Sequence, residues 1–340
     1  MNPTSPNTES SPLPPGLAEE LAQVWRALPE KFLLLALLFA WVLLFQILGN
    51  STFGYIDSPS LFGWLNYSYT QSKDDELGRY MPFIVGFLCW WKRDELVAVQ
   101  KTPWAGGLLI LLAAIVVHLL GFMIQQTRLS VVAFYLGIFG ILGAFWGRAF
   151  LKAVFFPYFL CAFCLPVGTM ADTLTLPLRM LATTLTTGLC KYVLGVGLIQ
   201  EGTRIFDTQH KFQYEVAAAC GGLRSLTATL ALASIYAFVT LRKPWKLATV
   251  ILSAFPLAVA GNVLRLTLIV IAAEAFGQKA GDWVHENAIL SLVPYIPAFL
   301  GLGALGSWLQ EKTTKPTTDA KPTPNPDVHA ESPEQHPAKP

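Results

Sequence analysis

The sequence predicts an all-α integral membrane protein, a helical bundle of about eight transmembrane helices plus one interfacial or re-entrant helix. Hydrophobic residues make up 53% and charged residues 14% of the 340 residues, which lies outside the range of soluble domains. Mean hydropathy is +0.48, and several apolar runs approach the roughly 20 residues that a helix needs to cross a bilayer. The net charge of +2 gives no reason to expect nucleic acid as a partner.

Nine apolar stretches are candidates for membrane spans. They cover residues 32–48, 80–91, 104–124, 129–147, 153–171, 180–199, 215–239, 247–273 and 288–309.

The basic residues indicate that one of these stretches does not cross. Lys and Arg mark cytoplasmic helix ends, and nine crossings would place Arg242, Lys243 and Lys246 outside. Stretch 180–199 is rich in Thr, contains Lys191 and has its larger apolar residues at helical spacing, which is typical of an interfacial or re-entrant helix. If this stretch stays at the outer face, eight spans remain and both termini are cytoplasmic. The turn that contains Arg242, Lys243 and Lys246 (the basic turn) is then cytoplasmic as well.

Two polar tails flank the predicted membrane domain, residues 17–312. Segment 1–16 is rich in Pro, Ser and Thr, and segment 313–340 is rich in Pro, Lys and Thr. We therefore expect both segments to be disordered. We expect no cleavable signal peptide, because the first apolar run starts near Phe32 and no small-residue cleavage site follows a short hydrophobic region.

Cys220 and Arg265 lie at equal distances on either side of the basic turn. Cys220 precedes Arg242 by 22 residues, and Arg265 follows Lys243 by 22. If the two runs are antiparallel helices joined at this turn, both residues lie about 33 Å from it, at the same depth. His285 follows Arg265 by 20 residues. We expect it to begin the next descending helix and so to return to the same outer face.

Cys220 has both a structural and a functional interpretation. An isolated cysteine in a membrane helix is commonly a small buried residue, as we expect for the CxxC pair at Cys161 and Cys164. At Cys220, however, Gly221 and Gly222 leave room for a substrate backbone to approach. Arg224, one turn further on, and a nearby helix N-terminus favour a thiolate.

Arg265 is the stronger indication of a functional site. A guanidinium within a span costs roughly 2.5–3.5 kcal/mol on insertion scales, unless it snorkels to the interface. Asn262, one turn earlier on the same face, could orient Arg265 or supply another donor. His285 is flanked by acids, and such a histidine is often solvated surface. If His285 lies at the same membrane depth as the Cys220 thiol, it becomes a candidate general acid or base.

Several short motifs follow one another in the second half of the chain. They are Pro177-Leu178-Arg179, Glu201-Gly202-Thr203, Tyr214-Glu215-Val216, Cys220-Gly221-Gly222-Leu223-Arg224-Ser225 and Asn262-Val263-Leu264-Arg265, followed by His285. In these residues the chain resembles an exosortase, of the exosortase/archaeosortase family of membrane-embedded protein-sorting enzymes. Family members commonly have Ser where this chain has Gly221. The resemblance places the catalytic part at about 177–309.

The resemblance implies a cysteine endopeptidase or transpeptidase with a thioester intermediate. Cys220 would be the nucleophile, Arg265 the group that stabilises the thiolate or oxyanion, and His285 the general acid/base. Supporting or substrate-binding roles are expected for Glu215, Gly221, Gly222, Arg224 and Asn262. No metal or organic cofactor is implied.

The implied substrates are exported proteins with a C-terminal Pro-containing motif, a transmembrane helix and a basic tail. Their new C-terminus would pass to a cell-surface acceptor, a glycan or a lipid. The enzyme would lie in the cytoplasmic (inner) membrane, with its site toward the periplasmic face. The alternative is a secondary transporter or lipid-linked precursor flippase with Arg265 binding an anionic substrate. We see no internal repeat of the kind that transporters often show.

Overall fold

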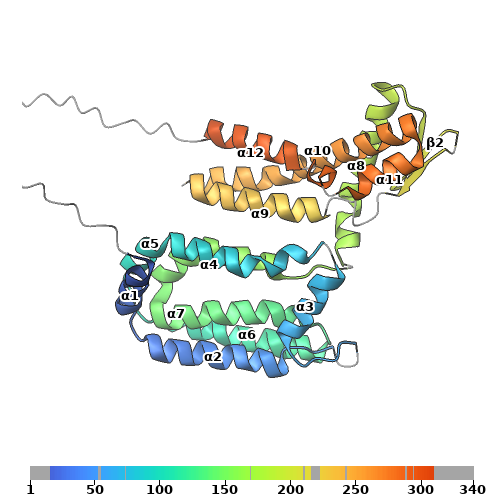
Figure 1. Cartoon of the computed structure of the whole chain (residues 1–340). Coiled ribbons are helices and arrows are strands. Elements are labelled where there is room, and N and C mark those ends of the chain that lie inside the picture. The colour runs from blue at the N-terminus through green and yellow to red at the C-terminus, as the bar shows by residue number, and fades with distance from the viewer. Residues whose placement is uncertain are drawn as a thin grey trace, which may run out of the picture.

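The structure, a computed structural model, is a bundle of helices whose axes mostly run in one direction (Figure 1). It describes residues 16–52, 55–72, 74–168, 170–209, 211–215, 223–241, 243–287, 289–293 and 295–309. Almost all of the predicted tails, and all of the segment 216–222 with Cys220, therefore lie outside the described residues.

The first half of the chain forms one group of helices. α3 begins after Ser60, whose Oγ accepts hydrogen bonds from the N–H groups of Phe62 and Gly63 at 3.1 and 3.2 Å, as an N-cap should. The elements are α1 (Leu17–Ala27), α2 (Lys31–Leu48), α3 (Leu61–Gln71), η1 (Glu76–Arg79), α4 (Met81–Trp91), α5 (Arg93–Ala98), α6 (Gly106–Met123), α7 (Thr127–Phe159) and η2 (Leu160–Cys164).

α7 is two helices that meet at Gly147. This residue has φ 83° and ψ 179°, and a Cβ there would collide with the carbonyl oxygen of Thr102, so only glycine fits. The chain folds back at this point, since the rings of Phe139 and Tyr158 lie 5.2 Å apart. The predicted stretches 129–147 and 153–171 therefore correspond to the two arms of a hairpin.

The second half forms a separate group that contains a small antiparallel sheet of order β1-β2-β3. α10 begins with proline, whose fixed φ and missing N–H suit a first helical turn. The elements are α8 (Met170–Tyr192), β1 (Leu198–Glu201), β2 (Arg204–Asp207), β3 (Gln213–Glu215), α9 (Leu223–Thr240), α10 (Pro244–Phe276), α11 (Gln278–Glu286), η4 (Leu290–Leu292) and α12 (Tyr295–Leu309).

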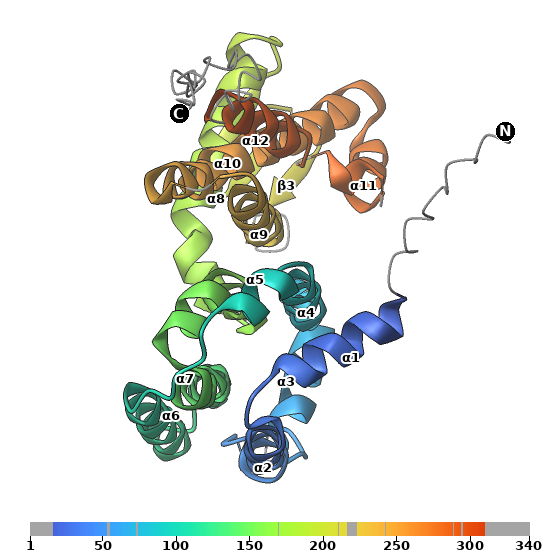
Figure 2. The ribbon, with the colours of Figure 1, turned by 90° about the vertical axis from the view of Figure 1, so that its left-hand side faces the viewer.

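Basic residues that the sequence places in the cytoplasm gather at one end of the bundle. Lys92 Nζ lies 4.1 Å from the centroid of the Phe238 ring, and Lys246 Nζ donates to the carbonyl of Leu309 at 2.7 Å. α1 and the last turn of α12 lie at this end, while the sheet and α11 lie at the other (Figure 1). Viewed along the bundle, α9, α10 and α12 form one cluster and α2, α6 and α7 another (Figure 2).

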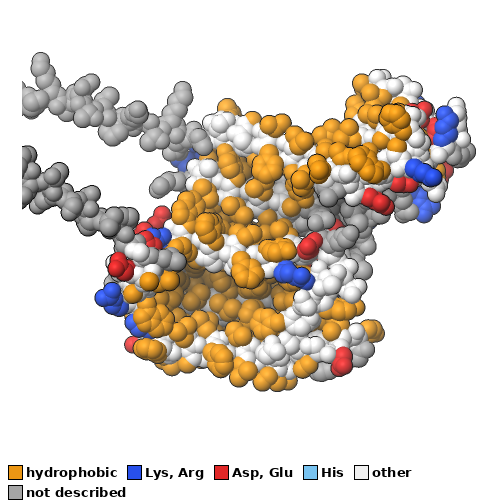
Figure 3. Space-filling view, viewed as in Figure 1, with side chains coloured by type: hydrophobic (Ala, Val, Ile, Leu, Met, Phe, Trp, Pro, Cys, Tyr) orange, Lys and Arg blue, Asp and Glu red, His pale blue; other side chains and the backbone are white. Residues whose placement is uncertain are grey.

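The exterior matches a protein surrounded by lipid. Apolar side chains cover much of the flank of the bundle, and most of the charged side chains in view lie toward its two ends (Figure 3). Among the described residues, four helical segments are long and apolar enough to span a membrane: Lys31–Leu48, Gly106–Met123, Thr127–Cys164 and Pro244–Phe276. Three shorter apolar helices accompany them. The all-α membrane fold is confirmed, and the number of eight spans stays a prediction.

Three local predictions need correction. Stretch 180–199 is not one helix, because α8 ends at Tyr192 and β1 follows; α8 lies across the other helices (Figure 1). Glu215 ends β3 and does not begin a span. His285 does not start the next descending helix: it lies in the last turn of the separate helix α11. In each case the chain divides into shorter elements than hydrophobic length alone reveals.

The arrangement of the two ends predicts the topology. Reporter fusions after Lys246 and after Gln310 should read as cytoplasmic, and a reporter inserted at Gly202, in the β1–β2 turn, should read as external. The physical reason is that basic helix ends stay on the cytoplasmic side. The measurement is paired enzymatic activity of the two reporter types. The same reading at Lys246 and Gly202 would contradict this topology.

Candidate active site

The site is built at the end of the α9–α10 hairpin that lies away from the basic turn. The two helices pack side by side through small residues, with Ala233, Ala237 and Ala254 fully buried in one cluster. Such residues let helix backbones approach closely in a membrane. The predicted antiparallel pairing about the basic turn is therefore confirmed, and it carries Asn262 and Arg265 to the end where α11 and the sheet lie.

Arg265 is half-buried on α10 and is held by α11. Its Nη2 donates a hydrogen bond to the carbonyl oxygen of His285 at 3.1 Å. Its Nε is buried and has no hydrogen-bond partner among the described residues. A buried donor left without a partner costs about 1–3 kcal/mol, so the guanidinium retains a donor that a further acceptor would satisfy.

His285 is half-buried beside this guanidinium. Burial lowers the pKa of its imidazole below the ordinary value, and the positive charge of Arg265 lowers it further. The carboxylates of Glu286 and Asp282 oppose this shift of the pKa. The ring therefore favours its neutral form near neutral pH, in which one nitrogen accepts a proton and the other can donate one.

The structure thus brings together two of the three residues predicted to be catalytic. Arg265 and His285 meet at one end of the bundle, as their spacing implied. Cys220, Gly221 and Gly222 lie outside the described residues, between the end of β3 and the start of α9. Arg224 falls in the first turn of α9. The end of β3 and the start of α9 thus lie on either side of the Cys220 segment. The position of the Cys220 thiol relative to Arg265 stays a prediction.

The sequence did not lead us to expect the small sheet. Its last strand, β3, directly precedes the segment that contains Cys220. Ile205 of β2 pairs with Tyr214 of β3, and Arg204 pairs with Glu215. A signal was present: Gly202, with φ 62°, separates two short stretches that both contain isoleucine, as a hairpin turn does. The strands are only three and four residues long, too short for a clear alternating pattern.

Asn262 is buried at the junction of three helices. It lines a small cavity with Leu178 of α8 and Leu226 of α9. Beside it, an apolar groove of about 770 Å³ runs between α8 and α10, and it shares Leu178 with the smaller cavity. The groove ends at Leu264, the residue before Arg265. The groove therefore reaches the residue that precedes Arg265 on α10, although Arg265 itself is not part of its lining.

Arg179 is a further buried charge near this junction. Its side chain on α8 is 9% exposed, and α8 packs against α10. The sequence reasoning noted Arg179 only as part of a motif. It directly precedes stretch 180–199, which was predicted to be interfacial, and its burial depends on how α8 crosses the other helices.

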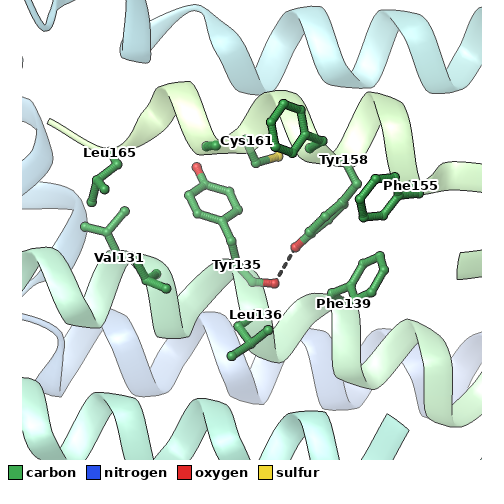
Figure 4. A pocket seen from close by; sticks show the side chains of 11 residues that line it. Val131, Tyr135, Leu136, Phe139, Phe155, Tyr158, Cys161 and Leu165 are labelled. Atoms are coloured by element: carbon green, nitrogen blue, oxygen red, sulfur yellow. Dashed lines mark hydrogen bonds between the residues drawn. The ribbon is translucent and has the colours of Figure 1, made fainter. Parts of the chain in front are cut away.

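A second cavity lies apart from these residues. It occupies about 350 Å³ between the arms of α7, where Tyr158 Oη donates to the carbonyl of Tyr135 at 2.5 Å (Figure 4). Its lining is apolar and aromatic and includes none of the predicted site residues.

The chain was also compared with known proteins. Residues 64–302 match the family model described as a transmembrane exosortase. This match covers more than two thirds of the chain and includes both Arg265 and His285. No curated protein and no solved structure shows a significant match. The resemblance inferred from the motifs is confirmed at the level of the family.

The lowered pKa of His285 predicts a pH-dependent stability. In the unfolded chain this imidazole binds a proton at about pH 6.5. The folded protein resists protonation there, so stability is full above about pH 6.5 and falls as the pH drops toward the folded pKa. The thermal unfolding midpoint of the purified protein should therefore fall between about pH 7.5 and about pH 5.5, and less steeply in His285→Asn. If the unfolding midpoint fell equally with pH in the wild-type protein and in His285→Asn, the lowered pKa of His285 would be contradicted.

Proposed function

Because the chain belongs to the transmembrane exosortase family, we propose that it is a membrane-embedded cysteine endopeptidase and transpeptidase. It cleaves the C-terminal sorting signals of exported proteins and transfers the new C-terminus to a cell-surface acceptor. The observation that carries the proposal is the hydrogen bond from Arg265 Nη2 to the carbonyl of His285, at the end of the hairpin whose other arm follows Cys220.

The proposed chemistry is acyl transfer through a thioester. The Cys220 thiolate attacks the substrate carbonyl, and Arg265 stabilises the thiolate or the oxyanion that develops. His285 first takes the proton of the Cys220 thiol, which forms the thiolate, and then gives this proton to the leaving amine as the C–N bond breaks and the thioester remains. It then takes a proton from the acceptor nucleophile, which attacks the thioester and releases the Cys220 thiolate, and the proton on His285 returns to the sulfur.

Three features of the described residues support this proposal. Arg265 is anchored through Nη2 while its buried Nε lacks a partner, which suits a guanidinium that stabilises an anion. His285 has a lowered pKa, which suits a group that both gives and takes a proton. The apolar groove that ends at Leu264 suits a substrate whose cleavage site adjoins a hydrophobic segment.

The remaining parts of the proposal follow from the family. The substrates carry a C-terminal motif, a transmembrane helix and a basic tail, and the acceptor is a glycan or lipid at the cell surface. Glu215, Gly221, Gly222, Arg224 and Asn262 support the site or bind substrate. The protein lies in the cytoplasmic (inner) membrane with the site at its outer face.

Loss of the thiol should abolish processing. Cys220→Ala and Cys220→Ser should both leave a co-expressed substrate at its uncleaved size, because neither side chain provides a thiolate at neutral pH. The measurement is the gel mobility of the substrate, with enzyme abundance checked by blot. Cys89→Ser, which changes a cysteine of α4 outside the site, is the matched control and should process normally. Normal processing by well-expressed Cys220→Ala would favour the transporter or flippase instead.

Arg265 and His285 should differ in how much activity survives. Arg265→Lys should fail nearly as badly as Cys220→Ala, because a compact ammonium cannot both reach the His285 carbonyl and present a second planar donor. His285→Ala should lose about 10²–10⁴-fold in rate, as is typical when a general acid/base is removed. Initial rates of cleavage by purified protein measure both effects. Near-normal rates for Arg265→Lys would remove the proposed role of the guanidinium.

A further inference from the structure

A cluster of polar side chains joins β3 to α11 and is not part of the proposed chemistry. We propose that Tyr214, Gln278 and Asp282 are positioning residues that hold β3 against α11, so that the strand that precedes the Cys220 segment and the helix that carries His285 keep a fixed relation. The consequence for catalysis rests on the proposed function, whereas the contact itself does not.

The contacts come from both the backbone and the side chains. Tyr214 Oη donates to the carbonyl oxygen of Gln278 at 3.1 Å. The N–H of Gln213 donates to Gln278 Oε1 at 3.1 Å, and Gln278 Nε2 donates to Asp282 Oδ1 at 2.8 Å. Gln278 therefore links the strand on one side to the next turn of its own helix on the other.

This arrangement also covers the edge of the sheet. β3 is an outer strand in the order β1-β2-β3, so one side of its backbone has no neighbouring strand in the part of the chain that the structure describes. An uncovered edge exposes unpaired N–H and C=O groups. The side chain of Gln278 takes the place of a fourth strand at Gln213, and this explains how so short a strand is held in place.

Gly281 permits the close approach of the Tyr214 ring. Gly281 is buried on the face of α11 that meets the strand. A Cβ at this position would overlap Tyr214 Oη and lie 2.9 Å from its Cζ and 3.0 Å from Ala273 Cβ. An alanine here would therefore displace the Tyr214 ring from its hydrogen bond with Gln278, or push α11 away from the strand or from α10.

α11 depends on this contact because it is short. It has nine residues, fewer than the roughly 12–15 that an isolated helix needs to be marginally stable in water. Its position is set by packing on α10 and by the contacts with β3. His285 lies one turn beyond Gly281, so any shift of the helix moves both the imidazole and the carbonyl that Arg265 binds.

Asp282 links the cluster to His285 electrostatically. Its charge raises the pKa of the imidazole, as does that of Glu286, and Arg265 of α10 lowers it. Burial and the same carboxylate raise the pKa of the Tyr214 phenol, which keeps its donor proton. A change at Asp282 should therefore reach His285 through charge as well as through position.

The contact can be tested by amide hydrogen exchange of the purified full-length protein. Gly281→Ala and Tyr214→Phe should both speed exchange across 278–286, while exchange in 244–262 of α10 stays unchanged. Gly303→Ala, at a site with nothing within 4 Å of the added Cβ, and Tyr192→Phe, at an 82% exposed tyrosine, are the matched controls. Unchanged exchange across 278–286 in Gly281→Ala would overturn the proposal.

The catalytic consequence has its own readout. Tyr214→Phe should lower kcat about 5-fold to 10-fold, the effect of one lost hydrogen bond, with little change in KM. The double variant Gly281→Ala/Tyr214→Phe should be no slower than Gly281→Ala alone, because both changes act on one contact. Additive losses would show that the two residues act separately and would overturn the positioning role.

The pH dependence separates positioning from general destabilisation. Asp282→Asn removes a charge that raises the His285 pKa, so the limb of the pH–rate profile that reports His285 should move to lower pH. A limb that stays in place would overturn the electrostatic link. If hydrogen exchange responds as expected but no variant, nor the wild-type protein, cleaves a substrate, the proposed function fails while the contact stands.

Discussion

The hydrogen bond from Arg265 Nη2 to the carbonyl of His285 joins two parts of the chain that have little else in common. One is a 33-residue apolar helix and the other a nine-residue polar one. A guanidinium in a membrane helix is costly unless it finds acceptors. Here the acceptor comes from the last turn of α11, where the carbonyls lack partners within the helix. This hydrogen bond therefore helps to hold α11 against α10, on which it also packs.

The other elements at this end follow from that constraint. α11 must be held at a defined position along α10. The contact of β3 with α11 at the buried Gly281 provides this. β3 in turn needs β1 and β2 to form a sheet at all, since two strands alone are at best marginally stable. A small sheet on an otherwise helical membrane protein is thus understandable as the support of one short helix.

The bilayer explains the remainder of the fold. Because lipid offers no hydrogen bonds, the chain crosses it only as helices, and non-helical segments are found at the ends of the bundle. The Gly147 turn lets α7 fold back as a tight hairpin, and the small residues of α9 and α10 let these helices pack closely. The side chains of the flank stay apolar where they face lipid (Figure 3).

The sequence by itself determined the membrane class, the family, the α9–α10 hairpin and the meeting of Arg265 with His285. These follow from hydrophobic length, basic turns and motif spacing, all of which are local properties. Only the tertiary structure decided the sheet, the direction of α8, the burial of Arg179 and the contact of Tyr214 with α11. The reason is physical: Gln213 and Gln278 lie 65 residues apart, and their contact arises only when separate segments pack together.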